Sequence, residues 1–134
     1  MPPPADPAAV EALNLRLEEL RARIAAAATR AGRDPKSVAL LPVTKGHPVE
    51  TVRAAVAAGL LELGENYVQE CQAKQDEVGR PVRWHLLGHL QRNKLRRAVR
   101  LFSMIESLDE ADLAGSLSAA NPGPEPLPVL LELE

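Results

Sequence analysis

The sequence predicts an α/β fold built on a parallel sheet. Short apolar runs without strict polar alternation recur along the chain, as expected of strands that are buried on both faces. An amphipathic stretch of helical length follows each of the first four runs, and glycine or proline residues interrupt the pattern. With 134 residues, 46% of them hydrophobic, the chain is long enough to bury one core, so we expect residues 1–134 to form a single domain.

The N-terminal part of the chain predicts a long helix. Residues 1–5 are rich in proline and are expected to form a disordered tail, whereas Asp6 and Pro7 suit the N-cap and first position of a helix. Apolar residues then recur at spacings of three and four and form one stripe: Val10, Leu13, Leu17, Leu20, Ile24 and Ala27. Gly32 and Pro35 end the helix. Because the stripe spans fewer than four heptads, packing on its own domain is favoured over a coiled coil.

The rest of the chain alternates strands and helices. Strands are predicted near 38–45, 60–64, 83–88, 102–107 and 128–133. Helices are predicted at 49–58, 66–78, 91–99 and 109–120. Five parallel strands fit either an open doubly wound sheet or part of an eight-stranded barrel, and periodicity does not distinguish the two.

Composition excludes several classes of protein. A formal charge of −2 and an aromatic content of 2% argue against a protein dominated by nucleic-acid contacts. No apolar run approaches the length of a membrane span, and residues 1–6 lack the pattern of a signal peptide, so we expect a cytoplasmic protein. Cys71 is the only cysteine, which excludes an intrachain disulfide, and we expect a buried side chain without a chemical role.

Lys45 is the first candidate for chemistry. Strand alternation places it on one face with Leu41 and Val43, and the C-terminal ends of parallel strands are where α/β proteins carry active sites. A partly desolvated lysine there would be a nucleophilic amine able to form a Schiff base with an aldehyde. On position alone, a surface lysine whose stem covers apolar atoms is the favoured interpretation.

Other polar residues follow the next predicted strands. Asn66 ends a Gly-Glu-Asn turn, and His85 and His89 flank Gly88, where the backbone is able to approach a ligand closely. Taken separately, Asn66 suits a helix cap, His85 a hydrogen-bonded core histidine and His89 an exposed loop residue. No third ligand stands at a suitable spacing from the two histidines, so we predict no metal site.

Three segments together resemble a known family. Leu41-Pro-Val-Thr-Lys45, Gly64-Glu-Asn-Tyr-Val-Gln-Glu70 and Trp84-His-Leu-Leu-Gly-His-Leu-Gln-Arg-Asn-Lys94 are similar, in order and interval, to the pyridoxal phosphate homeostasis proteins. The resemblance extends over roughly residues 10–133. It implies a (β/α)8 TIM-like barrel of the alanine racemase N-terminal type, of which this chain supplies about the first five strands. It also implies pyridoxal 5'-phosphate held as a Schiff base on Lys45, with Asn66 and His85 near the cofactor ring.

The resemblance implies a function in intracellular cofactor and amino-acid homeostasis without established catalysis, with amino acids or other amines as partners. The alternatives are a pyridoxal phosphate-dependent amino-acid racemase or related fold-type III enzyme, and a Schiff-base aldolase that uses Lys45 without a cofactor. Tyr67 is the only tyrosine, and alanine racemase takes its tyrosine base from a second domain, so a two-base racemase is not expected.

Members of this family are longer than 134 residues, so we expect the chain to be an N-terminal portion. The family's phosphate-binding part has no counterpart here, and we therefore expect weak cofactor binding by this chain alone. Unpaired strand edges favour self-association of such a portion, whereas a full-length form is expected to be a monomer.

One basic stretch, 92–100, is left unexplained by the resemblance. Helical spacing places Arg92, Arg96 and Arg100 on one face. A solvated face is the simpler interpretation, and a site for nucleic acid or another anionic partner is the alternative.

Overall fold

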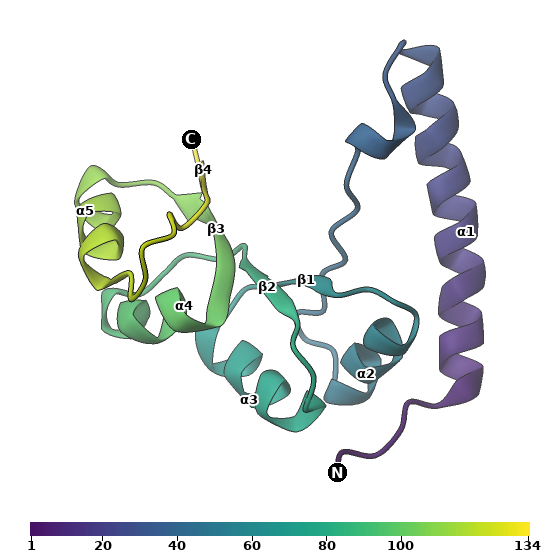
Figure 1. Cartoon of the computed structure of the whole chain (residues 1–134), viewed down its shortest axis with the longest axis horizontal. Coiled ribbons are helices and arrows are strands. Elements are labelled where there is room, and N and C mark those ends of the chain that lie inside the picture. The colour runs from purple at the N-terminus through teal and green to yellow at the C-terminus, as the bar shows by residue number, and fades with distance from the viewer.

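The computed structural model describes all 134 residues and contains one parallel sheet with helices packed against it (Figure 1). The strands are β1 (Glu62–Glu65), β2 (Arg83–Leu86), β3 (Phe102–Leu108) and β4 (Val129–Leu131). The α-helices are α1 (Pro7–Arg30), α2 (Val49–Ala57), α3 (Val68–Val78), α4 (Leu95–Leu101) and α5 (Ala111–Ala120). Two 3-10 turns, η1 (Pro35–Ser37) and η2 (Arg92–Lys94), precede the 38–48 segment and α4. The strands are ordered β1-β2-β3-β4 and all pairs are parallel, which confirms the predicted α/β fold.

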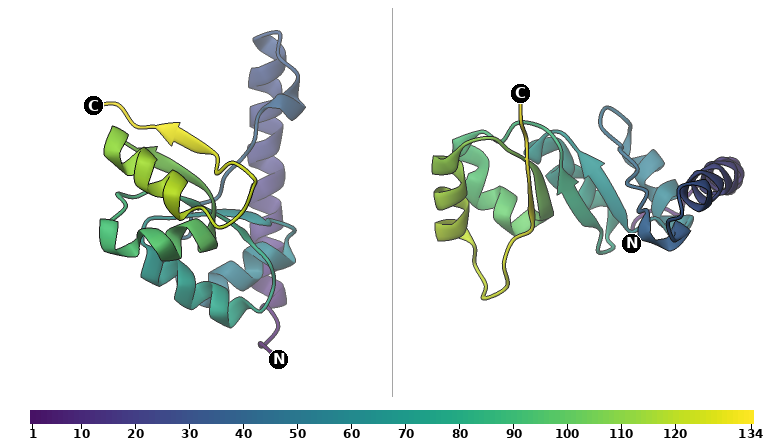
Figure 2. Two further views of the ribbon diagram at one scale, coloured as in Figure 1. Left: turned by 60° about the vertical axis from the view of Figure 1, so that its left-hand side comes forward. Right: turned by 90° about the horizontal axis from the view of Figure 1, so that it is seen from above.

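Helix α1 begins and ends as the sequence predicts. The Asp6 carboxylate accepts a hydrogen bond from the Ala8 amide at 3.1 Å, and Pro7 occupies the first turn. The helix contacts α2 and η1, while its far end extends away from the sheet (Figures 1 and 2). Leu17 of its apolar stripe is buried, but Leu20 is 38% exposed, so the stripe packs on its own domain only in part.

The predicted strand at 38–45 is wrong as a continuous strand. This segment makes a single parallel bridge, between Val43 and Gly64. The Thr44 amide donates to the Gly64 carbonyl at 3.0 Å, and the Gly64 amide donates to the Pro42 carbonyl at 2.8 Å. Proline has no amide hydrogen for the ladder, so the pairing does not extend through Pro42.

The remaining strands and helices follow the predictions with shifted ends. The predicted strands 60–64, 83–88 and 128–133 are shorter or displaced as β1, β2 and β4, whereas β3 matches 102–107 closely. The predicted helix 91–99 begins as the turn η2 and continues as α4 to Leu101. Phe102 starts β3 directly after α4, so no loop separates the two elements.

The two faces of the sheet differ in polarity. Leu63, Trp84 and Ile105 are completely buried on one face, where helices α2 to α5 accompany the strands (Figure 2). Cys71 of α3 belongs to this core, and burial raises the pKa of its thiol above the ordinary value. The other face, which we call the open face, carries His85 and Glu106. None of the helices is both long and apolar enough to cross a membrane.

Gly88 allows the chain to pass close to itself where β1 and β2 end. A Cβ atom at this position would lie 2.3 Å from the Asn66 carbonyl oxygen and 3.0 Å from its carbonyl carbon. The close approach predicted at Gly88 is therefore to backbone of this chain. The Gly88 carbonyl also accepts a hydrogen bond from the Ser107 hydroxyl at 2.7 Å, which joins the same turn to β3.

We predict that Gly88→Ala lowers the free energy of unfolding by about 1–3 kcal/mol, because the backbone at Asn66 has to move away from the new methyl group. Gly115→Ala is the matched control. Gly115 lies in α5 with open space around it, so the same substitution there raises stability by about 0.5–1 kcal/mol. Urea unfolding of both variants measures the difference, and equal effects at the two positions would contradict the steric explanation.

Candidate functional site

Lys45 lies at the edge of the sheet where the parallel strands end. It follows the Val43 bridge by two residues, Asn66 directly follows β1, and Asp109 directly follows β3. Because parallel strands all run in one direction, the residues that follow them meet at one edge. The sequence-based expectation that these segments share an edge therefore agrees with the topology.

The Lys45 side chain is exposed, but the backbone on both sides of it is fixed. Thr44 is 4% exposed, and its hydroxyl donates to Glu65 Oε1 at 2.6 Å. The Gly46 amide donates to Glu70 Oε1 at 2.8 Å. Gly46 also has φ 73°, a left-handed conformation that glycine adopts without strain. The Lys45 amine thus projects into solvent from a segment that is held at its neighbouring residues.

A buried lysine of α3 connects these contacts. Lys74 Nζ donates to the Thr44 carbonyl at 2.8 Å, to Glu65 Oε1 at 2.5 Å and to Glu70 Oε1 at 2.8 Å. We call Thr44, Glu65, Glu70 and Lys74 the Lys74 network. It attaches the segment around Lys45 to the end of β1 and to α3 with charged hydrogen bonds, which are stronger than neutral ones.

Electrostatics keep Lys74 and Glu70 of this network charged. Burial by itself would lower the pKa of Lys74, but hydrogen bonds to the Glu65 and Glu70 carboxylates outweigh it and raise the pKa above the ordinary value. The hydrogen bond from Lys74 is the largest cause that holds the pKa of Glu70 below its ordinary value, and the Gly46 amide lowers it further. Lys74 is therefore a cation and Glu70 an anion at neutral pH.

The sequence did not reveal this network. Glu65 and Glu70 stand inside the segment 64–70 with no pattern that marks them, and Lys74 falls in a polar run that is typical of a solvated helix. The one local signal is the spacing of four between Glu70 and Lys74, which permits an ion pair on a helix. That spacing gives no indication of burial, which depends on Thr44 and Glu65 from elsewhere in the chain.

His85 lies on the open face, hydrogen-bonded to one carboxylate and near a second. Its Nδ1 is 2.7 Å from Glu106 Oε1 on β3, and its Nε2 is 3.8 Å from Glu62 Oε1 on β1. His85 and Val43 both pair with Gly64, on opposite sides of β1. Two strand spacings therefore separate the Val43 and His85 backbones, about 10 Å.

Asn66 lines a hollow that contains neither of the other two predicted site residues. This hollow, of about 360 Å³, is also lined by Tyr67, Gly88, His89 and Lys94, whereas Lys45 and His85 do not line it. His89 is exposed, with Nδ1 3.7 Å from Asp109. No group of three or more histidine, cysteine, aspartate or glutamate side chains is arranged to hold a metal ion.

Comparison with known proteins identifies relatives. No protein-family model matches the chain. Proteins named pyridoxal phosphate homeostasis protein match 87% of the chain, at 44% identity in Pseudomonas aeruginosa and 38% in Escherichia coli K12. Each match covers 52% of the relative, so the chain spans about half the length of these curated proteins.

Solved structures also resemble the chain. PipY of Synechococcus elongatus PCC7942, solved with PLP bound, superposes with a TM-score of 0.63 at 45% identity, over 72% of this chain and 47% of that one. An unknown protein from Bifidobacterium adolescentis gives a TM-score of 0.74 at 32% identity, over 85% of this chain and 51% of that one. These matches confirm the resemblance that the three sequence segments indicated.

We predict that Lys74→Met lowers the free energy of unfolding by about 3–5 kcal/mol, because it leaves the fully buried Glu65 carboxylate without its cation. The double variant Glu65→Gln/Lys74→Met should recover part of this loss, since no unpaired charge then stays buried. Lys36→Met, at an exposed lysine, is the control and should change stability by less than about 0.5 kcal/mol. Chemical unfolding monitored by circular dichroism measures all three, and a Lys74→Met variant as stable as Lys36→Met would contradict the prediction.

We also predict a pH dependence that comes from Glu70. Because folding lowers its pKa below the ordinary value of 4.5, its stabilising contribution is fully present above pH 4.5 and is lost as pH falls through the folded-state pKa. The difference in unfolding free energy between the unsubstituted chain and Glu70→Gln should therefore shrink as pH is lowered from 7 to below 4.5. Glu18→Gln, at an exposed position of α1, should show no such trend. A Glu70→Gln difference that stays constant across this range would count against the assignment.

Proposed function

Since this chain is homologous to about half the length of the pyridoxal phosphate homeostasis proteins, we propose that it binds pyridoxal 5'-phosphate through Lys45 and acts in cofactor homeostasis. PipY with PLP bound, at 45% identity, supports the choice of cofactor. When bound, the cofactor supplies an aldehyde that forms a Schiff base with a primary amine.

The observation that carries the proposal is the fixed backbone around an accessible lysine. The Lys45 amine is exposed, so an aldehyde reaches it without displacing packed side chains. Hydrogen bonds at Thr44 and Gly46 hold the residues before and after it, which fixes the point on the backbone from which the Lys45 side chain extends. A positioned nucleophile reacts faster than a freely moving one because less orientational entropy is lost. The exposed amine therefore fits the aldehyde end of the cofactor.

We place His85 and Asn66 near the cofactor ring. His85 shares the open face with Val43, and its Nδ1 is engaged by Glu106, which fixes the orientation of the imidazole. Its Nε2 is 3.8 Å from the nearest carboxylate and is thus free to make a closer contact with a ligand. Asn66 contributes a side-chain amide from the end of β1.

We further propose that the sheet is part of a TIM-like barrel whose interior is the open face, with residues 1–134 as one domain. The Val43 bridge and β1 to β4 give five parallel segments in chain order, and helices accompany one face only. The hydrogen bond between His85 and Glu106 suits the interior of such a barrel, where buried polar groups are paired.

The test is reduction of the chain with borohydride in the presence of pyridoxal 5'-phosphate, followed by peptide mass spectrometry. We expect the reduced pyridoxyl group on Lys45 and its absence in Lys45→Arg, which keeps the charge but lacks a nucleophilic amine. Lys36→Arg is the matched control, since Lys36 is also exposed but lies outside the strand edge, and it should leave the modification of Lys45 unchanged. Labelling spread evenly over Lys36, Lys45 and Lys94 would contradict a specific site.

A further inference from the structure

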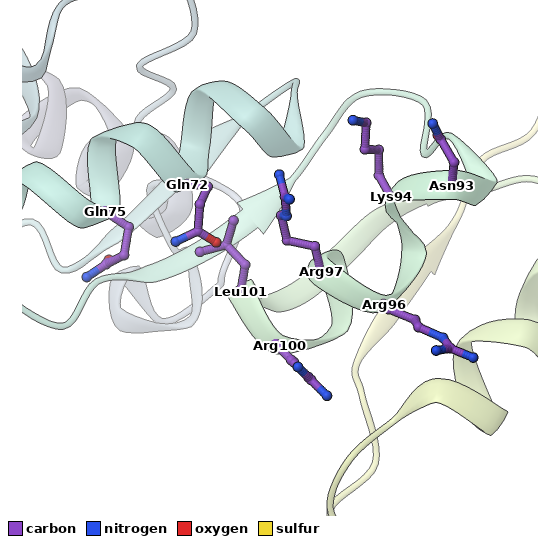
Figure 3. A pocket seen from close by; sticks show the side chains of 8 residues that line it. All are labelled: Gln72, Gln75, Asn93, Lys94, Arg96, Arg97, Arg100 and Leu101. Atoms are coloured by element: carbon purple, nitrogen blue, oxygen red, sulfur yellow. The ribbon is translucent and has the colours of Figure 1, made fainter.

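A groove between α3 and α4 gathers the basic residues that the cofactor proposal does not use (Figure 3). Its volume is about 700 Å³, and Lys94, Arg96, Arg97 and Arg100 line it. We propose that this groove binds an acidic segment of a partner protein, with aspartate and glutamate side chains paired to the four cations.

The charge of the groove is uncompensated. None of its four cations takes part in an ion pair, and no acidic side chain lines it. Arg92, which the sequence placed on the same face as Arg96 and Arg100, instead pairs with Glu110 at 3.0 Å and lies outside the lining. The cationic group is therefore Lys94 with three arginines of α4, and all four residues line the groove; Arg96 and Arg100 also line the neighbouring hollow beside α5.

The arrangement of the cations suits an extended ligand. Lys94 and Arg100 are six positions apart on a nearly continuous helical stretch, so their backbones are about 9 Å apart along the axis. The cationic ends point in different directions along α4 and do not converge on one point (Figure 3). Side chains on one side of an extended peptide repeat about every 7 Å, so two or three successive acidic groups span this length. Arginine also pairs with carboxylates in a two-pronged geometry.

The opposite wall of the groove is formed by two glutamines of α3, whose side chains are held by hydrogen bonds within the chain. The Gln75 amide accepts a hydrogen bond from Trp84 Nε1 at 2.8 Å and donates to the Arg80 carbonyl at 3.0 Å. Gln72 donates to Asp76 at 2.8 Å, and its side-chain oxygen makes no hydrogen bond within the chain. That oxygen is available to accept a hydrogen bond from the main-chain amide of a peptide.

The lining of the groove and the net charge of the chain favour a peptide over a nucleic acid as the ligand. No aromatic side chain lines the groove, so it offers no platform on which bases stack. The chain as a whole has a formal charge of −2, which disfavours a long polyanion that extends past the groove. A short acidic segment interacts only with the local positive charge.

The groove lies among the helices, whereas Lys45 and His85 belong to the strand edge and the open face. A result that contradicts one of the two proposals therefore leaves the other unaffected.

Fluorescence anisotropy tests the proposal with two labelled probes, a ten-residue peptide of alternating glutamate and serine and an oligothymidine of ten nucleotides. We expect the peptide to bind more tightly than the oligonucleotide, and its affinity to fall as salt is raised because screening weakens exposed charge pairs. The triple variant Arg96→Glu/Arg97→Glu/Arg100→Glu should lose at least about tenfold in affinity, since each arginine contact contributes a fraction of the binding free energy.

The matched control is Arg16→Glu/Arg21→Glu/Arg23→Glu, which makes the same change in net charge on the exposed surface of α1 and should bind the peptide with less than about threefold loss. Circular dichroism verifies that both variants fold. If the triple variant does not fold, Arg97→Gln takes its place, and we expect a smaller loss of peptide affinity from it. Equal losses in the two triple variants, tighter binding of the oligonucleotide, or no peptide binding at low salt would each overturn the proposal.

Discussion

The buried Lys74 cation is the contact on which the candidate site depends. The segment that carries Lys45 pairs with the sheet through one bridge only, so its backbone ladder is short. Lys74 adds hydrogen bonds to Thr44, Glu65 and Glu70, and each partner comes from a different part of the chain. A charged group in the interior is costly unless it is paired, and for that reason the network holds its members in one arrangement. The position of Lys45 thus follows from a helix thirty residues further along.

The two faces of the sheet carry different kinds of side chain. The helix-covered face is apolar and supplies most of the core, which includes Leu63, Trp84 and Ile105. The open face carries His85 with the Glu62 and Glu106 carboxylates beside it, and the exposed Lys45 lies at the strand edge. The division is not complete, because Glu65 and Lys74 are buried on the helix-covered side and also hold the segment that carries Lys45.

The sequence predicted the helices and the parallel sheet because both leave local signals. Asp6 and Pro7 fixed the start of α1, and the apolar runs around Leu63 and Ile105 marked buried strands. The strand predicted at 38–45 was too long, because an apolar run does not show which backbone amides find hydrogen-bond partners. Pro42 has no amide hydrogen to donate to the neighbouring strand. Lys74 was missed for a related reason: its burial is created by groups that are nine and thirty residues away, so no local pattern reports it.

The contact between Gly88 and Asn66 has a consequence for protein engineering. The turns after β1 and β2 are in close contact, because the Asn66 carbonyl lies where a side chain at position 88 would begin. New loops grafted at either turn would have to be designed as a pair, because lengthening one displaces the other. The exposed proline-rich connection between α5 and β4 has no such neighbour at Gly123, so it is the better place to insert a peptide tag or a reporter domain.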